Sequence, residues 1–477
     1  MAEAADGLLV FVKRECPTCV LVEPVLAALA QDGAHIVTQD DPAFPAGVQR
    51  VIDDRALERS FAHDIEIVPT LLRLAGGREV GRAIGWHREE WRALSGLGEL
   101  GTGLPAERPG CGSLTQEPGI AEQLALRHCR VRFQARAIEL GEQEDAVEAA
   151  FARGWSDGLP VVPPTRERVY RMLQGASRQP EDVLGLAPPN LVPCTVEKVA
   201  INAVMAGCRP DYFPVVLAVI EAALTHEFCM HGLLCTTMFS GPMVIVNGPV
   251  RRAIGMNWGV NALGQGNRAN ATIGRALQLV IRNVGGGLPG GIDRATLGNP
   301  GKYTFCFAED EDDTLWEPLS VEHGLPRGAS AVTLFAGDGV QPMVDQKSRT
   351  PDSLARSFAA CLTVAHHPKL ALGGDAFLIV SPEHYRVFRA AGWSKQRTKD
   401  EINRLLLRPG AELMSGVGGM AEGLPARFRD QMVPKFRQGG LKIVRAGGQA
   451  GLFSAIVTGW AAAGDYGSSP VTKEVRA

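Results

Sequence analysis

Cys16 and Cys19 lie between a short apolar run and a helical pattern, and this order constrains the fold of the N-terminal region. Residues 8–12 are all apolar, which predicts a buried strand. Apolar residues then recur at helical spacing to about residue 31, and Pro17 suits the first turn of a helix. Because free amides at a helix start favour a thiolate, we expect Cys16 to be reactive, with Cys19 one turn away.

The following residues continue as an alternation of strands and helices. The patterns predict a strand at 35–38, a mostly helical segment at 48–61, a strand at 65–74, a hairpin partner at 79–86 and a closing helix at 87–94. Strands mixed with helices favour an α/β class for this domain.

Three short motifs in this region resemble the thioredoxin and glutaredoxin superfamily. They are the Cys-Pro-Thr-Cys at 16–19 after a strand, the Val-Pro-Thr at 68–70 before a hairpin, and the Gly-Trp at 85–86. The resemblance covers about residues 6–97 and implies a thioredoxin-like redox domain over 1–97.

The resemblance also implies roles for individual residues. Cys16 would be the attacking thiol and Cys19 the resolving thiol, and the Val68-Pro69 bond would be cis, lie against the pair and contact substrate backbone. One departure is Val10, which stands where thioredoxins carry a buried acid. With Pro-Thr between the cysteines, the direction of electron flow stays open. The alternatives are half of a metal site or inert core thiols, although no second CxxC motif completes a zinc site.

The segment 98–120 is rich in glycine and proline, which predicts a flexible linker containing Cys111. A thiol on a mobile tether could exchange with Cys16 or shuttle between domains; the alternative is an incidental cysteine in a loop. The chain has ten cysteines and no export signal, so a disulfide framework is not expected.

Residues 121–477 are predicted to form one large α/β or α+β domain with a helical lead-in at 121–153. Expected strands lie at 243–246, 303–307, 331–335, 376–380 and 441–446, and expected helices at 166–173, 196–207, 212–225, 273–283, 353–365, 382–391 and 399–407. The segments 155–165, 392–395 and 453–457 resemble a poorly characterised bacterial family loosely associated with UGSC-type selenoproteins. The UGSC motif is absent; residues 111–114 match it in part but lack its last cysteine. No catalytic residue is transferred from that family.

Three local patterns in the large domain are candidate sites. Four soft ligands within ten residues could hold a metal or present thiols to the CxxC domain: His226, Cys229, His231 and Cys235. Glycine-rich segments with charged residues could bind a substrate or anion: Gly264, Gly266, Arg268, Arg275, Asp293, Arg294 and Lys302. The alternatives are buried core cysteines, a tight turn with a helix cap, and a surface loop. The acidic run 309–313 is interpreted as a solvated loop, and the histidines at 366, 367 and 384 have no evident partners.

The charge balance and the hydropathy pattern argue against nucleic-acid and membrane partners. The 49 Lys and Arg residues nearly balance the 52 Asp and Glu residues, and no basic stripe indicates nucleic acid. No apolar stretch reaches the roughly 20 residues that a membrane helix needs, so a cytoplasmic location without a membrane partner is expected.

These patterns lead to one functional hypothesis and its alternatives. We expect a thiol-disulfide oxidoreductase whose CxxC domain serves a fused, catalytic second domain acting on a thiol, sulfur or small-molecule substrate. Regeneration would come from glutathione or a separate reductase, and the redox domain needs no cofactor of its own. The loose dinucleotide-type match at Gly264, Gly266 and Ala269 does not follow a good strand, so it does not indicate a nicotinamide or flavin site. The alternatives are a ligand-binding or metal-handling protein with a redox-sensing module. Metal content and oligomeric state stay open.

Overall fold

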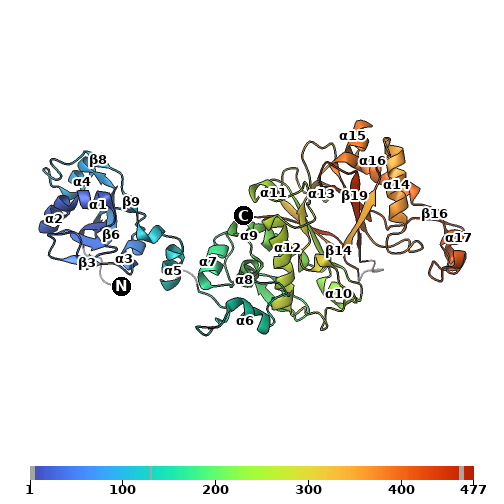
Figure 1. The fold of residues 1–477 in the computed structure, drawn as a ribbon, viewed down its shortest axis with the longest axis horizontal. Helices are drawn as coiled ribbons and strands as arrows, with labels where there is room; N and C mark the ends of the chain where they lie inside the picture. The colour runs from blue at the N-terminus through green and yellow to red at the C-terminus, as the bar shows by residue number, and fades with distance from the viewer. Residues whose placement is uncertain (1–5, 129–131, 461–466, 477) are drawn as a thin grey trace. The chain divides into compact units, whose positions relative to one another are not determined.

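The computed structural model describes residues 6–128, 132–460 and 467–476, and the chain divides into two compact units, Met1–Arg132 and Phe133–Ala477. Both units mix helices with strands, in agreement with the predicted α/β class (Figure 1). Within the described ranges, no helix is long and apolar enough to cross a membrane.

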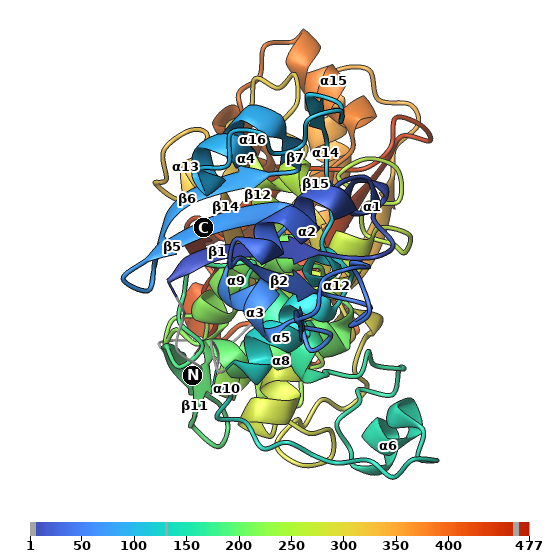
Figure 2. The ribbon, with the colours of Figure 1, turned by 90° about the vertical axis from the view of Figure 1, so that its left-hand side faces the viewer.

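The first unit is built on a five-stranded sheet with the order β3-β2-β1-β5-β6. Strands β1, β2 and β3 run parallel, β5 is antiparallel to β1, and β6 is antiparallel to β5. Figure 2 shows α1, α2 and α4 beside these strands, and α2 contacts β2 while α4 contacts β5 and β6. The main elements are β1 (Gly7–Val12), α1 (Pro17–Leu21), α2 (Glu23–Gln31), β2 (His35–Thr38), β3 (Val51–Asp53), α3 (Glu58–Ala62), β5 (Thr70–Ala75), β6 (Arg78–Ile84), α4 (Arg88–Ser95) and α5 (Ile120–Arg127).

The helix predicted over 48–61 is wrong for most of its length. Val51 and Ile52 extend the sheet as β3, and only residues 58–62 are helical. The carboxylate of Asp54 accepts hydrogen bonds from the backbone amides of Arg59 and Ser60, and this bonding starts the short helix late.

The segment 98–120 is part of the first unit and is not a flexible linker. Its strand β8 (Glu107–Arg108) pairs with β7 (Trp86–His87), and its strand β9 (Cys111–Gly112) pairs with β4 (Ile67–Val68). Leu100 is buried in the core. Gly110 serves close packing here, since a Cβ on it would lie 2.6 Å from the carbonyl oxygen of Val68. The boundary between units therefore lies near residue 132 and not at 98–120.

The second unit contains a seven-stranded mixed sheet with the order β13-β12-β14-β19-β15-β18, and β20 pairs with β14. Helices α8, α9 and α12 contact one another, and α9 also contacts β14; α14, α15 and α16 gather near β15 and β18 (Figure 1). The strands are β10 (Val183–Ala187), β11 (Val192–Thr195), β12 (Gly241–Asn247), β13 (Cys306–Ala308), β14 (Ala331–Val344), β15 (Ala376–Val380), β16 (Arg408–Pro409), β17 (Met432–Val433), β18 (Leu441–Arg445), β19 (Phe453–Gly459) and β20 (Val471–Glu474). The helices are α6 (Ala146–Ala152), α7 (Arg166–Leu173), α8 (Val196–Ala206), α9 (Phe213–Ala223), α10 (Met230–Cys235), α11 (Val250–Ala253), α12 (Arg268–Val280), α13 (Leu319–Glu322), α14 (Pro351–Thr363), α15 (Pro382–Ala390), α16 (Lys395–Leu405) and α17 (Gly410–Leu413).

Charged residues are buried at one end of this sheet. Glu309 and Lys395 are each only 3% exposed, and the Lys395 ammonium lies 3.4 Å from Glu309 and 3.1 Å from Glu322. Glu309 also accepts a hydrogen bond from the Asn247 amide, and burial raises the pKa of the Glu309 carboxyl. The acidic run 309–313 therefore begins inside the protein, in contrast to the solvated loop predicted from sequence.

Replacing Lys395 tests whether this ion pair supports the fold. Lys395→Met leaves Glu309 buried without its cation, and we expect the free energy of unfolding of the second unit to fall by about 3–5 kcal/mol. The matched control, Arg404→Met on the same helix, removes an exposed pair with Glu401 and should cost less than about 1 kcal/mol. Urea unfolding measures both losses, and equal losses would contradict this view of the network.

Candidate active site

Cys16 lies at the start of α1, where its sulfur receives backbone and side-chain contacts from three elements. It is the N-cap residue of α1, and its Sγ accepts a hydrogen bond from the Cys19 amide at 3.4 Å. The same sulfur lies 3.4 Å from the carbonyl oxygen of Val68, and the Val68-Pro69 bond is cis, in agreement with the prediction. Neither the Cys16 nor the Cys19 side chain is exposed to solvent.

A third thiol, Cys111, lies against Cys16. The two sulfur atoms are 2.8 Å apart, although 95 residues separate them in the chain. The antiparallel pairing of β4 with β9 sets Cys111 opposite Val68. Cys111 is half-buried, so among these three cysteines it is the one that solvent reaches.

The three thiols have unequal acidities. The pKa of Cys16 is lowered to about 5, first by the hydrogen bond from the Cys19 thiol and then by that from Cys111, while burial opposes the shift. The pKa of Cys19 and the pKa of Cys111 are both raised, and burial is the largest cause in each case. Because its pKa lies below neutrality, Cys16 is the thiol of the three that is deprotonated at pH 7. The negative charge of the cluster therefore resides on Cys16.

The absorbance of the reduced protein at the thiolate band tests this assignment. We expect a titration with a midpoint at about pH 5 that disappears in Cys16→Ser. Cys19→Ala removes the hydrogen bond that lowers the pKa most, so the midpoint should rise. The control Cys208→Ala, at a buried thiol whose pKa is raised to about 12, should leave the midpoint unchanged. A midpoint near 9 in the wild type would contradict the assignment.

The soft ligands of the second unit are spread around the short helix α10. Cys229 precedes the helix and is half-buried, Cys235 ends it and is exposed, and His226 and His231 are exposed. In the ranges that the structure describes, no group of three or more His, Cys, Asp or Glu side chains is arranged to hold a metal ion.

The predicted anion residues near α12 have other bonds in the structure. Arg275 makes two hydrogen bonds to the carboxylate of Asp157, and both side chains are nearly buried. Arg268 is exposed and donates to the carbonyl oxygen of Gly207. Gly264 and Gly266 lie in an exposed loop that leads into the helix, whose N-cap is Asn267. Arg275 thus joins two segments of the second unit.

Lys302 and Asp293, predicted from the second glycine-rich segment, do come together. The Lys302 ammonium lies 2.8 Å from the carboxylate of Asp293, which is only 9% exposed. Arg294 is exposed, and its backbone amide donates to the carbonyl oxygen of Leu234. This loop is therefore tied to the end of α10.

The sequence did not reveal a polar cluster around Asp338. One carboxylate oxygen lies 2.7 Å from the His366 ring and accepts a hydrogen bond from Thr458 at 3.0 Å, while the other contacts the Ser240 hydroxyl. His366 has a positive φ of 60°, which is uncommon for a residue other than glycine. Because these residues come from distant segments, no local pattern signals the cluster. His384 is also paired, with Ser454 at 2.7 Å.

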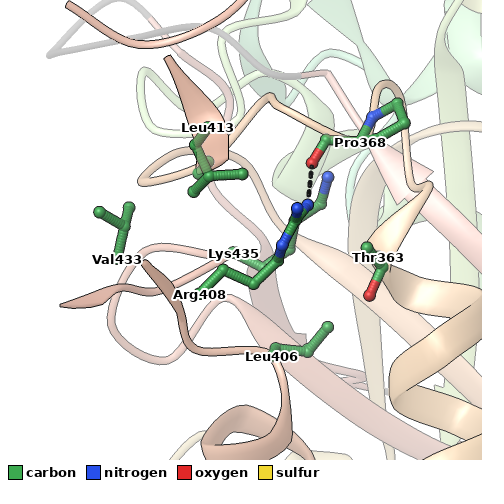
Figure 3. Close-up of a pocket in the computed structure, with 8 residues that line it drawn as sticks. Thr363, Pro368, Leu406, Arg408, Leu413, Val433 and Lys435 are labelled. Carbon is green, nitrogen blue, oxygen red and sulfur yellow. Dashed lines mark hydrogen bonds between the residues drawn. The ribbon is translucent and has the colours of Figure 1, made fainter. Parts of the chain in front are cut away.

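Figure 3 shows a hollow of the second unit lined by Lys435 and Arg408. It has room for about one water molecule. Burial lowers the pKa of Lys435 to about 8, and its ammonium donates to the carbonyl oxygens of Ala365 and His367, both at 2.8 Å. Arg408 donates to the carbonyl oxygen of Pro368. These bonds tie neighbouring loops together, and the hollow is too small for an organic substrate.

Neither a protein-family model nor a curated protein matches this sequence. The residues and their geometry therefore carry every inference about function.

Proposed function

We propose that this protein is a thiol-disulfide oxidoreductase with a thioredoxin-like N-terminal domain, in which Cys16 attacks and Cys19 resolves. The observation that carries the proposal is the position of the Cys16 sulfur, which accepts from the Cys19 amide and lies beside the Val68 carbonyl. The sheet supports it, because the Cys-Pro-Thr-Cys motif follows a central strand that has a parallel strand on one side and an antiparallel hairpin on the other.

The chemistry follows from the unequal acidities. The Cys16 thiolate attacks one sulfur of a substrate disulfide, and the other substrate sulfur leaves as a thiolate that takes up a proton. Cys19 then loses its proton and attacks Cys16, which releases the second substrate thiol and leaves a Cys16–Cys19 disulfide. Two electrons thus pass to the substrate, and of the two protons that its thiols gain, one comes from Cys19 and the other from solvent. Glutathione or a separate reductase is the proposed source of the electrons that restore the dithiol.

The second unit is the proposed recipient of this chemistry. Its exposed Cys235 is the more accessible of the two candidate thiols, while Cys229 is half-buried. A disulfide-containing small molecule bound in the second unit, or a disulfide formed by one of these cysteines, would be the species that the first unit reduces. A cytoplasmic location fits this proposal, because reducing compartments keep such thiols available.

Turnover with a disulfide substrate tests the proposal. In the presence of excess dithiothreitol or glutathione, the full chain should accelerate reduction of insulin disulfides. Cys16→Ser should abolish the acceleration because the attacking thiolate is gone. Cys208→Ser, at a buried cysteine of the second unit, should keep the wild-type rate. A Cys16→Ser variant as fast as the wild type would refute the assignment.

A further inference from the structure

The Cys111 sulfur lies against the buried Cys16 sulfur and is the more exposed of the two. Cys16 is fully buried, and the half-buried Cys111 sulfur lies 2.8 Å from it. A disulfide bond is about 2.05 Å long, so the two sulfurs need to approach by less than about 1 Å to bond. In this arrangement Cys111 is the thiol beside Cys16 that solvent reaches.

The placement of Cys111 is built by bonds on both sides of it. Before it, the hydroxyl of Thr18, which lies within the CxxC motif, donates to the carbonyl oxygen of Pro109 at 2.7 Å. After it, the Ser113 amide donates to the carbonyl oxygen of Glu66 at 2.8 Å. Together with the β4–β9 pairing, these bonds hold the Cys111 backbone on the strand that leads to Pro69.

Buried polar groups continue the attachment beyond Cys111. The Gln39 side chain makes two bonds: its Nε2 donates to the Ser113 hydroxyl at 2.7 Å, and its Oε1 accepts from the Leu114 backbone amide at 3.0 Å. The Thr115 hydroxyl donates to the carbonyl oxygen of Ile65 at 2.6 Å. Gln39, Ser113 and Thr115 are all buried, so these bonds are shielded from competing water. The segment is therefore a fixed part of the site.

We propose that Cys111 is the third redox thiol of the site, which exchanges disulfides with Cys16 and carries them between Cys16 and external low-molecular-weight disulfides or thiols. The inference rests on the proposed function, since it requires Cys16 to be an exchanging thiolate. Cys16 and Cys19 are buried, so Cys111 would be the thiol that meets disulfides or thiols arriving from solvent.

With an external disulfide such as oxidised glutathione, three thiol-disulfide exchanges follow one another. Cys111 loses its proton and attacks the disulfide, forming a mixed disulfide and releasing one glutathione as the thiol. The Cys16 thiolate attacks the Cys111 sulfur, which forms a Cys16–Cys111 disulfide and releases the second glutathione. Cys19 then loses its proton and attacks Cys16, and Cys111 leaves and regains a proton. The net change is oxidation of Cys16 and Cys19 and reduction of one glutathione disulfide.

Removing Cys19 from the full chain should stop this sequence at the Cys16–Cys111 disulfide. Reduced Cys19→Ser is treated with oxidised glutathione, quenched with an alkylating agent and analysed by peptide mass spectrometry. We expect a Cys16–Cys111 linkage, release of two glutathione thiols per chain and no lasting glutathione adduct on Cys16. A lasting Cys16–glutathione adduct beside a free Cys111, or a linkage of Cys16 to Cys229 or Cys235, would overturn the proposal.

The double variant Cys19→Ser/Cys111→Ser separates this inference from the proposed function. With no partner thiol left in the site, Cys16 should carry glutathione as a stable adduct. If the double variant forms that adduct and Cys19→Ser also retains it, Cys16 exchanges disulfides but Cys111 does not take part. If Cys16 stays unmodified in both variants, the exchange chemistry itself fails, and the role of Cys111 fails with it.

Discussion

The pairing of the two-residue strands β4 and β9 is the contact on which the thiol site depends. It brings a segment that follows the domain core back across the strand before Pro69, and it sets Cys111 opposite Val68. The pairing places the Cys111 sulfur 2.8 Å from the buried Cys16 sulfur. With it, Cys16 is buried, has two thiol neighbours and keeps its negative charge through their hydrogen bonds.

The close approach also explains the glycine at residue 110. A side chain at residue 110 would meet the Ile67 side chain at 2.4 Å as well as the Val68 backbone, so a glycine is required there. Gly85, whose φ is +71°, faces the same stretch of chain, and a Cβ on it would lie 3.0 Å from the Gly110 nitrogen. Glycine indicates flexibility when read locally, but at residues 85 and 110 it allows backbone to lie against backbone.

Local patterns predicted the elements whose apolar residues face a single core. The strands at 35–38 and 376–380 and the helix at 166–173 have the bounds expected from sequence. Strand β14 was predicted only to residue 335 but continues to Val344, because Gly337, Gly339 and Pro342 resemble a turn while the sheet accommodates them at an irregular pairing with β19. Strand β19 was missed as a strand, since its partners β14 and β15 are distant in sequence.

The candidate sites likewise divide into features that local sequence motifs indicate and features that depend on contacts between distant segments. The closeness of Cys16 to Cys19 and the cis bond before Pro69 could be predicted because short motifs with a characteristic separation indicate them. The contact of Cys111 with Cys16, and the cluster around Asp338, depend on tertiary structure alone.

The most direct test of the account is a redox titration of the full chain in glutathione buffers, with alkylation and mass spectrometry to count free thiols at residues 16, 19 and 111. The account predicts that one two-electron step removes two of these three thiols together, as an internal disulfide that includes Cys16. If Cys16 and Cys19 instead lose their thiols independently, each as a glutathione adduct, the three cysteines are not a single exchange site and the account is wrong.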